Sequence, residues 1–283
     1  MSKLLAVDLD GTLFYPRQLT RKIPKKNVEF LQNWIDSGNK VVLISSRSYE
    51  FTESLNAEIK RPVDFINYNG TQFRINGVLV KDSPMDNKVL GLILEKIIKM
   101  NKTIAFLSSS DRFPAVLRDN VGFGKLMRGF YRLWYWMQGQ YKERYLVDND
   151  LFDSEIRNGK VYCVRMFFGV KKNKKMVAKE VTTSVRPEFP ENESSWTELM
   201  IELTPKGSNK ADALSYYVDK INMNRKNIYV IGDSGNDITM FTTFHKHSYC
   251  MKHSNAAVKK YARNTISRVY KLEKILKKGK NND

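Results

Sequence analysis

Short, mainly apolar runs, each closed by a polar turn, recur along the chain. They are Leu4–Val7 before Asp8-Leu9-Asp10-Gly11, Lys40–Ile44 before Ser45-Ser46-Arg47, and Asn227–Ile231 before Gly232-Asp233-Ser234-Gly235-Asn236-Asp237. A strand buried on both faces, as in a parallel sheet, has such an uninterrupted apolar run. The pattern therefore predicts three central strands of a parallel sheet, each followed by a polar loop.

The segments between these runs have the period of amphipathic helices. After Pro24, apolar residues such as Leu31 and Trp34 recur on one face until Gly38, which is typical of a helix that ends at a glycine. A further helix is expected to end near Lys60.

A third strand, predicted over residues 62–66, and a hairpin around Asn76-Gly77 complete the first part of the chain. Strands that alternate with helices are typical of a doubly wound parallel sheet. The fold class is therefore expected to be α/β, with a Rossmann-like core.

The alternation changes character near residue 82. From there the pattern predicts a helix over 86–100, strands at 103–107, 161–168 and 196–203, a Lys-rich helix near 174–185 and a loop over 191–195. We interpret residues 82–203 as an inserted α/β domain, within a core formed by residues 1–81 and 204–283. In the second core segment, Ser208 is expected to cap a helix, and the tail after Asn255 is predicted to be helical and basic.

Positive charge is the most unusual feature of the composition, with a formal net charge of +18 over 283 residues. Residues 81–190 and 238–283 carry +9 each, whereas residues 191–237 carry −3. This charge favours anionic partners, which include phosphate esters, nucleic acids and anionic lipids, and does not choose among them. The basic, aromatic stretch 122–145 could stack on bases or lie at a membrane surface. We favour a role for it in the core of the inserted domain or the wall of a substrate pocket.

Two cysteines, Cys163 and Cys250, lie far apart, and no Cys/His spacing is typical of a metal site. No apolar run reaches the roughly eighteen residues of a membrane span. The first apolar strand begins near the N-terminus and leaves no room for a secretory signal. The expectation is a cytoplasmic protein without a disulfide framework.

Polar side chains at the ends of the predicted strands are the candidate functional residues. Because the carboxyl ends of parallel strands share one edge of a sheet, these groups can converge there. Two carboxylates as close as Asp8 and Asp10 repel each other, so a divalent cation is implied. Lys210 begins the helix before the last of these strands. Together the groups offer a carboxylate nucleophile, an acid–base group, a hydroxyl, an ammonium and metal-binding carboxylates, a set suited to phosphoryl transfer.

Local structural roles are the alternatives for these residues. Asp8 and Asp10 would also suit a capped turn, and Ser45 a helix cap. A salt bridge is as good an interpretation of Arg47 as substrate contact.

Lys206 is a rival of Lys210, although the Ser-Asn-Lys entry into a helix favours Lys210. The three histidines of the second core segment are expected to be ordinary exposed residues rather than metal ligands. They are His245, His247 and His253.

Four of these segments carry a resemblance to a known family. Val7-Asp8-Leu9-Asp10-Gly11-Thr12 resembles the first motif of the haloacid dehalogenase (HAD) superfamily of phosphohydrolases. Ser45, Lys210 and Gly232–Asp237 look like its second, third and fourth motifs. The insertion before Lys210 resembles the Cof-type branch with its C2B cap, and Asn69-Gly70 looks like the loop before that cap.

The resemblance covers both core segments, whereas the cap matches in size and placement only. Ser46 departs from the Thr-Gly-Arg that is usual in the family. Without a glycine at this position, the loop can differ in how closely it approaches a phosphate.

The resemblance implies a mechanism with an aspartyl-phosphate intermediate. Asp8 would attack phosphorus, and Asp10 would protonate the leaving oxygen and then deprotonate the attacking water. Mg²⁺ would be held by Asp8, the backbone carbonyl of Asp10, and Asp233, while Ser45 and Lys210 would clamp the phosphoryl oxygens. Asn236 and Asp237 would support the metal or orient Lys210. The candidate residues are thus catalytic Asp8, Asp10 and Lys210, phosphate-binding Gly11, Ser45, Ser46, Arg47 and Asn236, and metal-binding Asp8, Asp10, Asp233 and Asp237.

The expected function is hydrolysis of a phosphate monoester of a small metabolite, such as a sugar phosphate or a nucleotide-like ester. A phosphomutase is the near alternative, because it would use the same two aspartates. A basic protein that binds nucleic acid or another anion and keeps a vestigial site is the alternative from another class. The intact set of acids and lysine argues against that last hypothesis.

Overall fold

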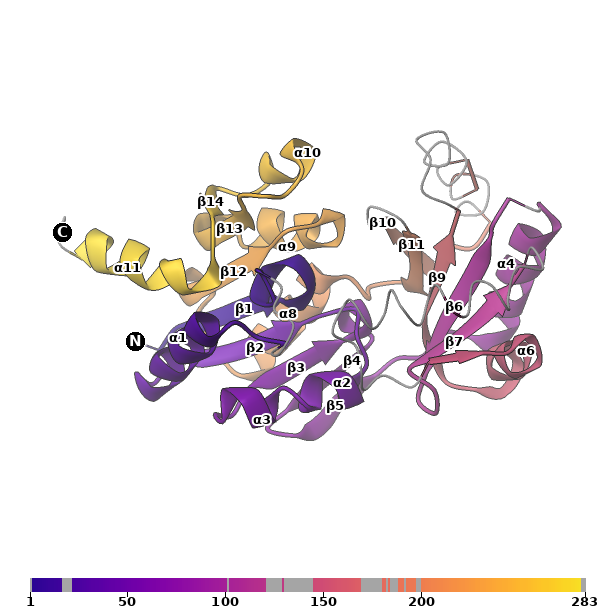
Figure 1. The fold of residues 1–283 in the computed structure, drawn as a ribbon, viewed down its shortest axis with the longest axis horizontal. Helices are drawn as coiled ribbons and strands as arrows, with labels where there is room; N and C mark the ends of the chain where they lie inside the picture. The colour runs from indigo at the N-terminus through magenta and orange to yellow at the C-terminus, as the bar shows by residue number, and fades with distance from the viewer. Residues whose placement is uncertain are drawn as a thin grey trace. The chain divides into compact units, whose positions relative to one another are not determined.

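The computed structural model describes residues 2–16, 22–100, 102–120, 129, 145–168, 180–181, 183, 188–190, 192–196 and 200–280. The chain divides into two units (Figure 1). The first unit comprises Met1–Val80 and Asn209–Asp283, and the second comprises Lys81–Ser208. The division expected from the sequence had a core of residues 1–81 and 204–283 and an insertion of residues 82–203.

The first unit is built on one eight-stranded sheet with the order β14-β13-β12-β1-β2-β3-β4-β5. From β14 to β3 neighbouring strands are parallel, and β4 is antiparallel to β3. The doubly wound α/β fold is therefore confirmed, with the predicted hairpin at one edge. The strands are β1 (Leu4–Asp8), β2 (Lys40–Ile44), β3 (Asp64–Asn67), β4 (Gln72–Ile75), β5 (Val78–Asp82), β12 (Ile228–Gly232), β13 (Ser248–Met251) and β14 (Asn264–Ile266).

Helices cover both faces of this sheet, which explains the uninterrupted apolar runs. Leu5 and Val7 of β1 belong to a cluster with α1, α2, α3 and α11, whereas Leu4 and Ala6 belong to a cluster with α8, α9 and α10. Successive side chains of a strand point to opposite faces, so every position of β1 is buried. The helices are α1 (Lys25–Asp36), α2 (Tyr49–Glu53), α3 (Asn56–Ile59), α8 (Lys210–Lys220), α9 (Ile238–Thr243), α10 (Ala256–Lys259) and α11 (Leu272–Lys280).

The second unit has a six-stranded sheet with the order β10-β11-β9-β6-β7-β8. Its pairs are antiparallel except β7 with β8. Side chains of α4 and α6 pack on one face of the sheet against Phe106, Val164 and Ile201. The elements are β6 (Ala105–Ser110), β7 (Ala115–Asp119), β8 (Tyr145–Val147), β9 (Val161–Phe167), β10 (Asn192–Trp196), β11 (Met200–Pro205), α4 (Asn87–Lys99) and α6 (Asn149–Asn158).

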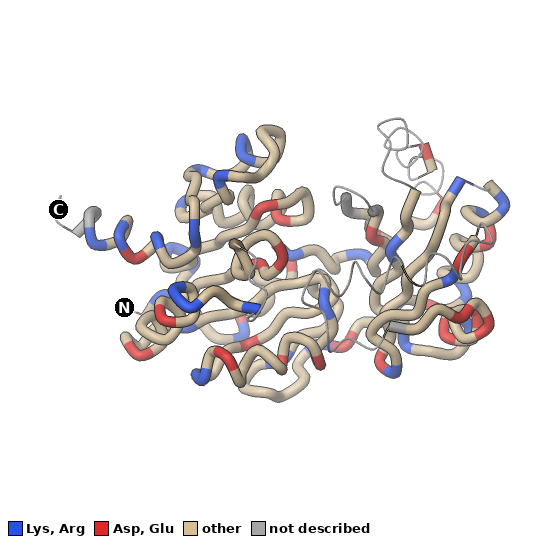
Figure 2. The backbone as a smooth tube through the Cα atoms, in the orientation of Figure 1, with Lys and Arg blue, Asp and Glu red and all other residues tan. Residues whose placement is uncertain are grey.

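Several local predictions were wrong. The expected loop over 191–195 coincides with strand β10, and Asn209 rather than Ser208 caps α8 by accepting a hydrogen bond from the Asp212 N–H. The basic tail, whose lysines and arginines are coloured blue in Figure 2, contains strand β14 between its helices. The expected helix near 174–185 and the aromatic stretch 122–145 lie largely outside the described residues. No helix of the described part has the length and apolarity to cross a membrane.

A buried hydrogen bond ties helix α8 to the first residue of β3. Tyr217, which is fully buried, donates from Oη to Oδ2 of Asp64 at 2.6 Å, and Oδ1 of Asp64 accepts from the Asn76 N–H at 2.7 Å. The two bonds to Asp64 therefore join the helix, the strand and the hairpin turn.

Tyr217→Phe is expected to lower the free energy of unfolding by roughly 1–3 kcal/mol, because a buried acceptor loses its donor. Urea denaturation of the two proteins measures this difference. Tyr216→Phe is the matched control, since Tyr216 is 41% exposed and its change is expected to stay within about 0.5 kcal/mol. Equal effects of the two substitutions would contradict the prediction.

Candidate functional site

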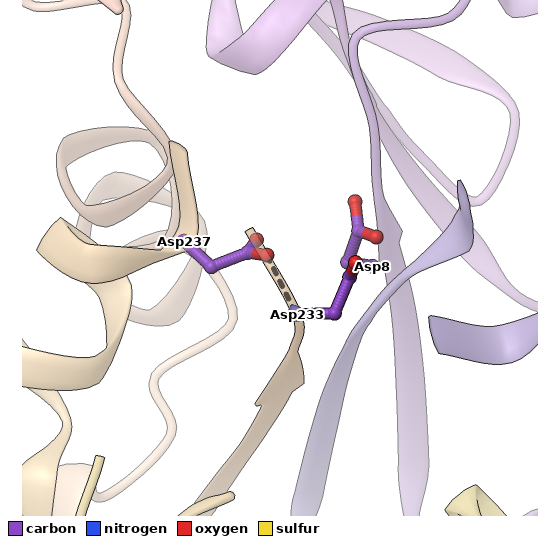
Figure 3. A group of neighbouring side chains, drawn as sticks. All are labelled: Asp8, Asp233 and Asp237. Atoms are coloured by element: carbon purple, nitrogen blue, oxygen red, sulfur yellow. Dashed lines mark hydrogen bonds between the residues drawn. The ribbon is translucent and has the colours of Figure 1, made fainter. Parts of the chain in front are cut away.

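Three acidic side chains meet at the carboxyl edge of the sheet in the first unit. Asp8 ends β1, and Asp233 and Asp237 follow the neighbouring strand β12. Each offers a carboxylate oxygen, and these oxygens all lie within 4.8 Å of one another. Figure 3 shows the three side chains directed toward a common region. The predicted convergence of the strand ends therefore holds for these acids.

Lys210 supplies the positive charge of this group. It is the first residue of α8 and is 1% exposed, and its Nζ donates to Oδ1 of Asp8 at 2.6 Å and to Oδ1 of Asp237 at 2.7 Å. Burial lowers the pKa of Lys210, but the carboxylates of Asp237 and Asp8 outweigh it and raise that pKa above its ordinary value. Lys206, the rival in the sequence, is exposed. The structure thus places Lys210, not Lys206, among the acids.

Asp237 is held on both of its oxygens. Oδ1 accepts from Lys210, while Oδ2 accepts from the backbone N–H groups of Asp233 and Ser234 at 2.9 and 3.0 Å. These contacts fix the carboxylate within the turn that follows β12. They favour the role of orienting Lys210, one of the two that the family resemblance implied.

Asp233 faces the loop that follows β1. Its Oδ1 accepts from the Thr12 hydroxyl at 2.9 Å. Gly11 has φ +80°, and a Cβ built there would lie 2.4 Å from Oδ2 of Asp233. Both the backbone conformation and the close approach therefore require glycine at position 11. The site residues predicted from the sequence do not include Thr12.

Burial and mutual repulsion shape the ionisation of these acids. Burial raises the pKa of Asp8 well above its ordinary value; Lys210 opposes this rise, and Asp237 and Asp233 add to it. Burial and Asp237 likewise raise the pKa of Asp233 to about 7, against the lowering effect of Thr12 and Lys210. When all three carboxyl groups are ionised, the single ammonium of Lys210 leaves an excess of negative charge among them. An all-oxygen set of this kind fits a hard divalent cation, which would supply the missing positive charge.

Asp10 lies outside this cluster and is paired with Arg47. The guanidinium donates from Nε to Oδ2 and from Nη2 to Oδ1 of Asp10, both at 2.6 Å. The Arg47 side chain is 6% exposed and that of Asp10 is 45% exposed. Arg47 also lies over the Phe51 ring, with Cζ 4.1 Å from the ring centroid. The salt bridge considered for Arg47 is therefore present.

The remaining candidates have local partners. Ser45 is buried, and its hydroxyl accepts from the Arg47 N–H at 3.2 Å. The helix cap considered for Ser45 is wrong, because Ser48 is the N-cap of α2 and accepts from the Phe51 N–H. Asn236 donates to Oδ1 of Asn69 at 3.4 Å and accepts from the Ser234 hydroxyl at 2.7 Å. Ser46 is partly exposed. Phosphate binding by Ser45, Ser46, Arg47, Gly11 and Asn236 stays a prediction.

Two histidines lie against aromatic rings. His247 stacks on Tyr229 with ring centroids 4.3 Å apart, and His253 lies 3.9 Å from the centroid of Tyr15. Within the described part of the chain, the acid cluster contains no histidine.

Comparison with known proteins agrees with this arrangement. The sequence model for haloacid dehalogenase-like hydrolases matches residues 5–273. A Mycoplasma genitalium protein named as a candidate phosphatase is 28% identical over 294 residues, which cover 98% of this chain and 95% of that protein. The Bacillus subtilis 5-amino-6-(5-phospho-D-ribitylamino)uracil phosphatase YcsE is 26% identical over 240 residues, which cover 84% of this chain and 79% of that protein. The solved HAD subclass IIB sugar phosphatase BT4131 has a TM-score of 0.73 at 18% identity, and the match covers 97% of this chain and 99% of that one.

The affinity of the site for a divalent cation is expected to rise with pH. Because the pKa of Asp233 is raised to about 7, the carboxyl carries a proton below that pH, and a cation has to displace it. Affinity should therefore increase as the pH rises through about 7. Isothermal titration calorimetry in buffers of different ionisation enthalpy measures both the affinity and the protons released.

Asp219→Asn is the control for this titration, because the Asp219 side chain is 68% exposed and lies outside the acid cluster. This variant should keep the pH dependence of the wild type. A cation affinity that stays constant across the same pH range would contradict the prediction.

Proposed function

The chain belongs to the haloacid dehalogenase-like hydrolase family, and we propose that it is a Mg²⁺-dependent phosphatase that hydrolyses the phosphate monoester of a small metabolite. One observation carries this proposal: Asp8 is buried, paired with Lys210 and grouped with Asp233. A carboxylate so placed is oriented for attack, and the ammonium beside it can hold an anionic phosphoryl group.

The proposed reaction has two chemical steps, both carried by residues of the first unit. In the first, a carboxylate oxygen of Asp8 attacks phosphorus, the ester P–O bond breaks, and Asp10 gives a proton to the leaving oxygen. In the second, Asp10 takes a proton from water, which attacks phosphorus and releases phosphate and the Asp8 carboxylate. Lys210 and Ser45 are proposed to bind the phosphoryl oxygens.

Asp8, Asp233 and the backbone carbonyl of Asp10 are the proposed ligands of Mg²⁺. The cation, when bound, neutralises negative charge on the phosphoryl group. The contacts of Asp237 support a positioning role for it, since both of its oxygens are already engaged.

The inserted second unit is proposed to be the cap that selects the substrate. Its place in the chain, between the two segments of the core, supports this assignment. The names of the relatives point to phosphorylated metabolites with a sugar or ribityl part. A sugar phosphate or a nucleotide-like ester is therefore the proposed substrate class.

Asp8→Asn is expected to lower kcat by roughly 10⁴-fold or more, because the nucleophile is lost. Release of phosphate from p-nitrophenyl phosphate, with Mg²⁺ and with a chelator, measures this loss and the metal requirement. Asp219→Asn, an exposed acid outside the site, is the matched control and should stay within about twofold of the wild type. Activity that survives Asp8→Asn, or that does not depend on Mg²⁺, would refute the mechanism.

We expect the protein to release free phosphate from at least one member of a panel of phosphorylated metabolites. The panel contains sugar phosphates, nucleotides and 5-amino-6-(5-phospho-D-ribitylamino)uracil. Product analysis distinguishes the two reactions that use an aspartyl phosphate. An isomeric phosphate ester without free phosphate would assign the chain to the phosphomutases instead.

A further inference from the structure

Asn67 has a buried side-chain amide and is the last residue of β3. It is 0% exposed. Its Nδ2 donates to the backbone carbonyls of Arg47 and Ser48, each at 3.2 Å, and to the Thr52 hydroxyl at 2.9 Å. Asn67 thus holds the loop that leads from β2 into α2.

The orientation of this amide is fixed by its surroundings. Two of its three partners are carbonyl oxygens, which only accept, so the nitrogen and not the oxygen of the amide must face them. Among the described residues, Oδ1 of Asn67 has no hydrogen-bond partner. Burying a polar atom in this way costs free energy. All the side-chain hydrogen bonds described for Asn67 therefore go to the segment of residues 47–52.

The loop between β2 and α2 contains Arg47, which connects Asn67 to Asp10 through a series of contacts. The carbonyl oxygen of Arg47 also accepts from the N–H of Tyr68, the residue after β3, at 3.3 Å, so this one backbone atom has two donors. The guanidinium lies over the Phe51 ring and donates hydrogen bonds to both carboxylate oxygens of Asp10. Because contacts hold both the backbone and the side chain of Arg47, its guanidinium has a fixed position and orientation.

We propose that Asn67 is a positioning residue that acts through Arg47 on Asp10. The amide fixes the Arg47 backbone, and the guanidinium in turn holds the Asp10 carboxylate in the orientation needed for proton transfer to the leaving oxygen. This inference rests on the proposed function, because it takes Asp10 as the acid–base group. A small displacement of such a group has a large effect on rate.

The choice of leaving group separates this role from a purely structural one. A p-nitrophenolate leaves with little protonation, whereas an alkoxide needs a proton from the general acid. The value of kcat/KM reports the steps through departure of the leaving group. Misplaced Asp10 should therefore lower kcat/KM much more for an alkyl phosphate than for p-nitrophenyl phosphate.

The test compares Asn67→Ala and Asn67→Ser with the wild type on both substrates, the alkyl phosphate being one that the wild type turns over. We expect kcat/KM to fall roughly 10- to 100-fold on the alkyl phosphate and less than about threefold on p-nitrophenyl phosphate. Asn67→Ser keeps a small donor and should lose less on the alkyl phosphate. Rates are normalised to the folded fraction, which thermal unfolding measures. If Asn67→Ala is too unstable to assay, the comparison is made with Asn67→Ser alone.

A double-mutant cycle tests the route through Arg47. In an Arg47→Ala background, Asn67→Ala should lower kcat/KM on the alkyl phosphate by less than about twofold, because the guanidinium that it positions is gone. Tyr217→Phe is the control for lost stability, since it removes a buried hydrogen bond at the first residue of the same strand. It should change the two substrates equally.

An equal loss on both substrates in the Asn67 variants would overturn the inference, as would a full effect of Asn67→Ala in the Arg47→Ala background. Both outcomes leave the proposed phosphatase standing. Activity that survives Asp8→Asn would instead overturn the proposed function and this inference with it.

Discussion

Compensation of buried negative charge is the constraint on which the functional region of the first unit depends. Asp8 and Asp237 are almost completely buried, and Asp233 lies beside them. Carboxylates removed from water are stable only with positive charge or donors close by. Lys210 provides that charge from a position 202 residues after Asp8 in the chain. The two segments of the first unit are thereby joined by an ion pair as well as through the apolar core.

The order of the strands makes this compensation possible. β1 lies between β2 and β12, so the loops after all three strands share one edge. Each loop is then fixed by side chains from a neighbour: Thr12 contacts Asp233, and Asn67 contacts the carbonyl of Arg47. The insertion of the second unit separates these segments in sequence without disturbing the register of β1 with β12.

The sequence predicted the features that follow from two-sided burial and missed those that depend on pairings and side-chain contacts without a distinctive local pattern. The strands with long apolar runs, and Lys210 at a helix start, were found because their local pattern is distinctive. β10 was missed because Asn192–Trp196 is mostly polar and pairs with one neighbour only, at the edge of its sheet. Asn67 resembles an ordinary residue at the end of a strand, and its role is visible only in its contacts with residues 47–52.

The two aspartates of the first loop, although only two residues apart, lie in different electrostatic surroundings. Asp8 is buried and shares the Lys210 ammonium with Asp237, whereas Asp10 is about half exposed and is held by a guanidinium. A nucleophile and an acid–base group need such a division, because one must face phosphorus and the other must exchange a proton with the leaving group and with water. Gly11 makes the division possible: its positive φ turns the chain between Asp10 and Thr12 and lets the backbone pass against Asp233. The different roles proposed for the two acids therefore follow from one turn of the backbone and from two separate cationic partners.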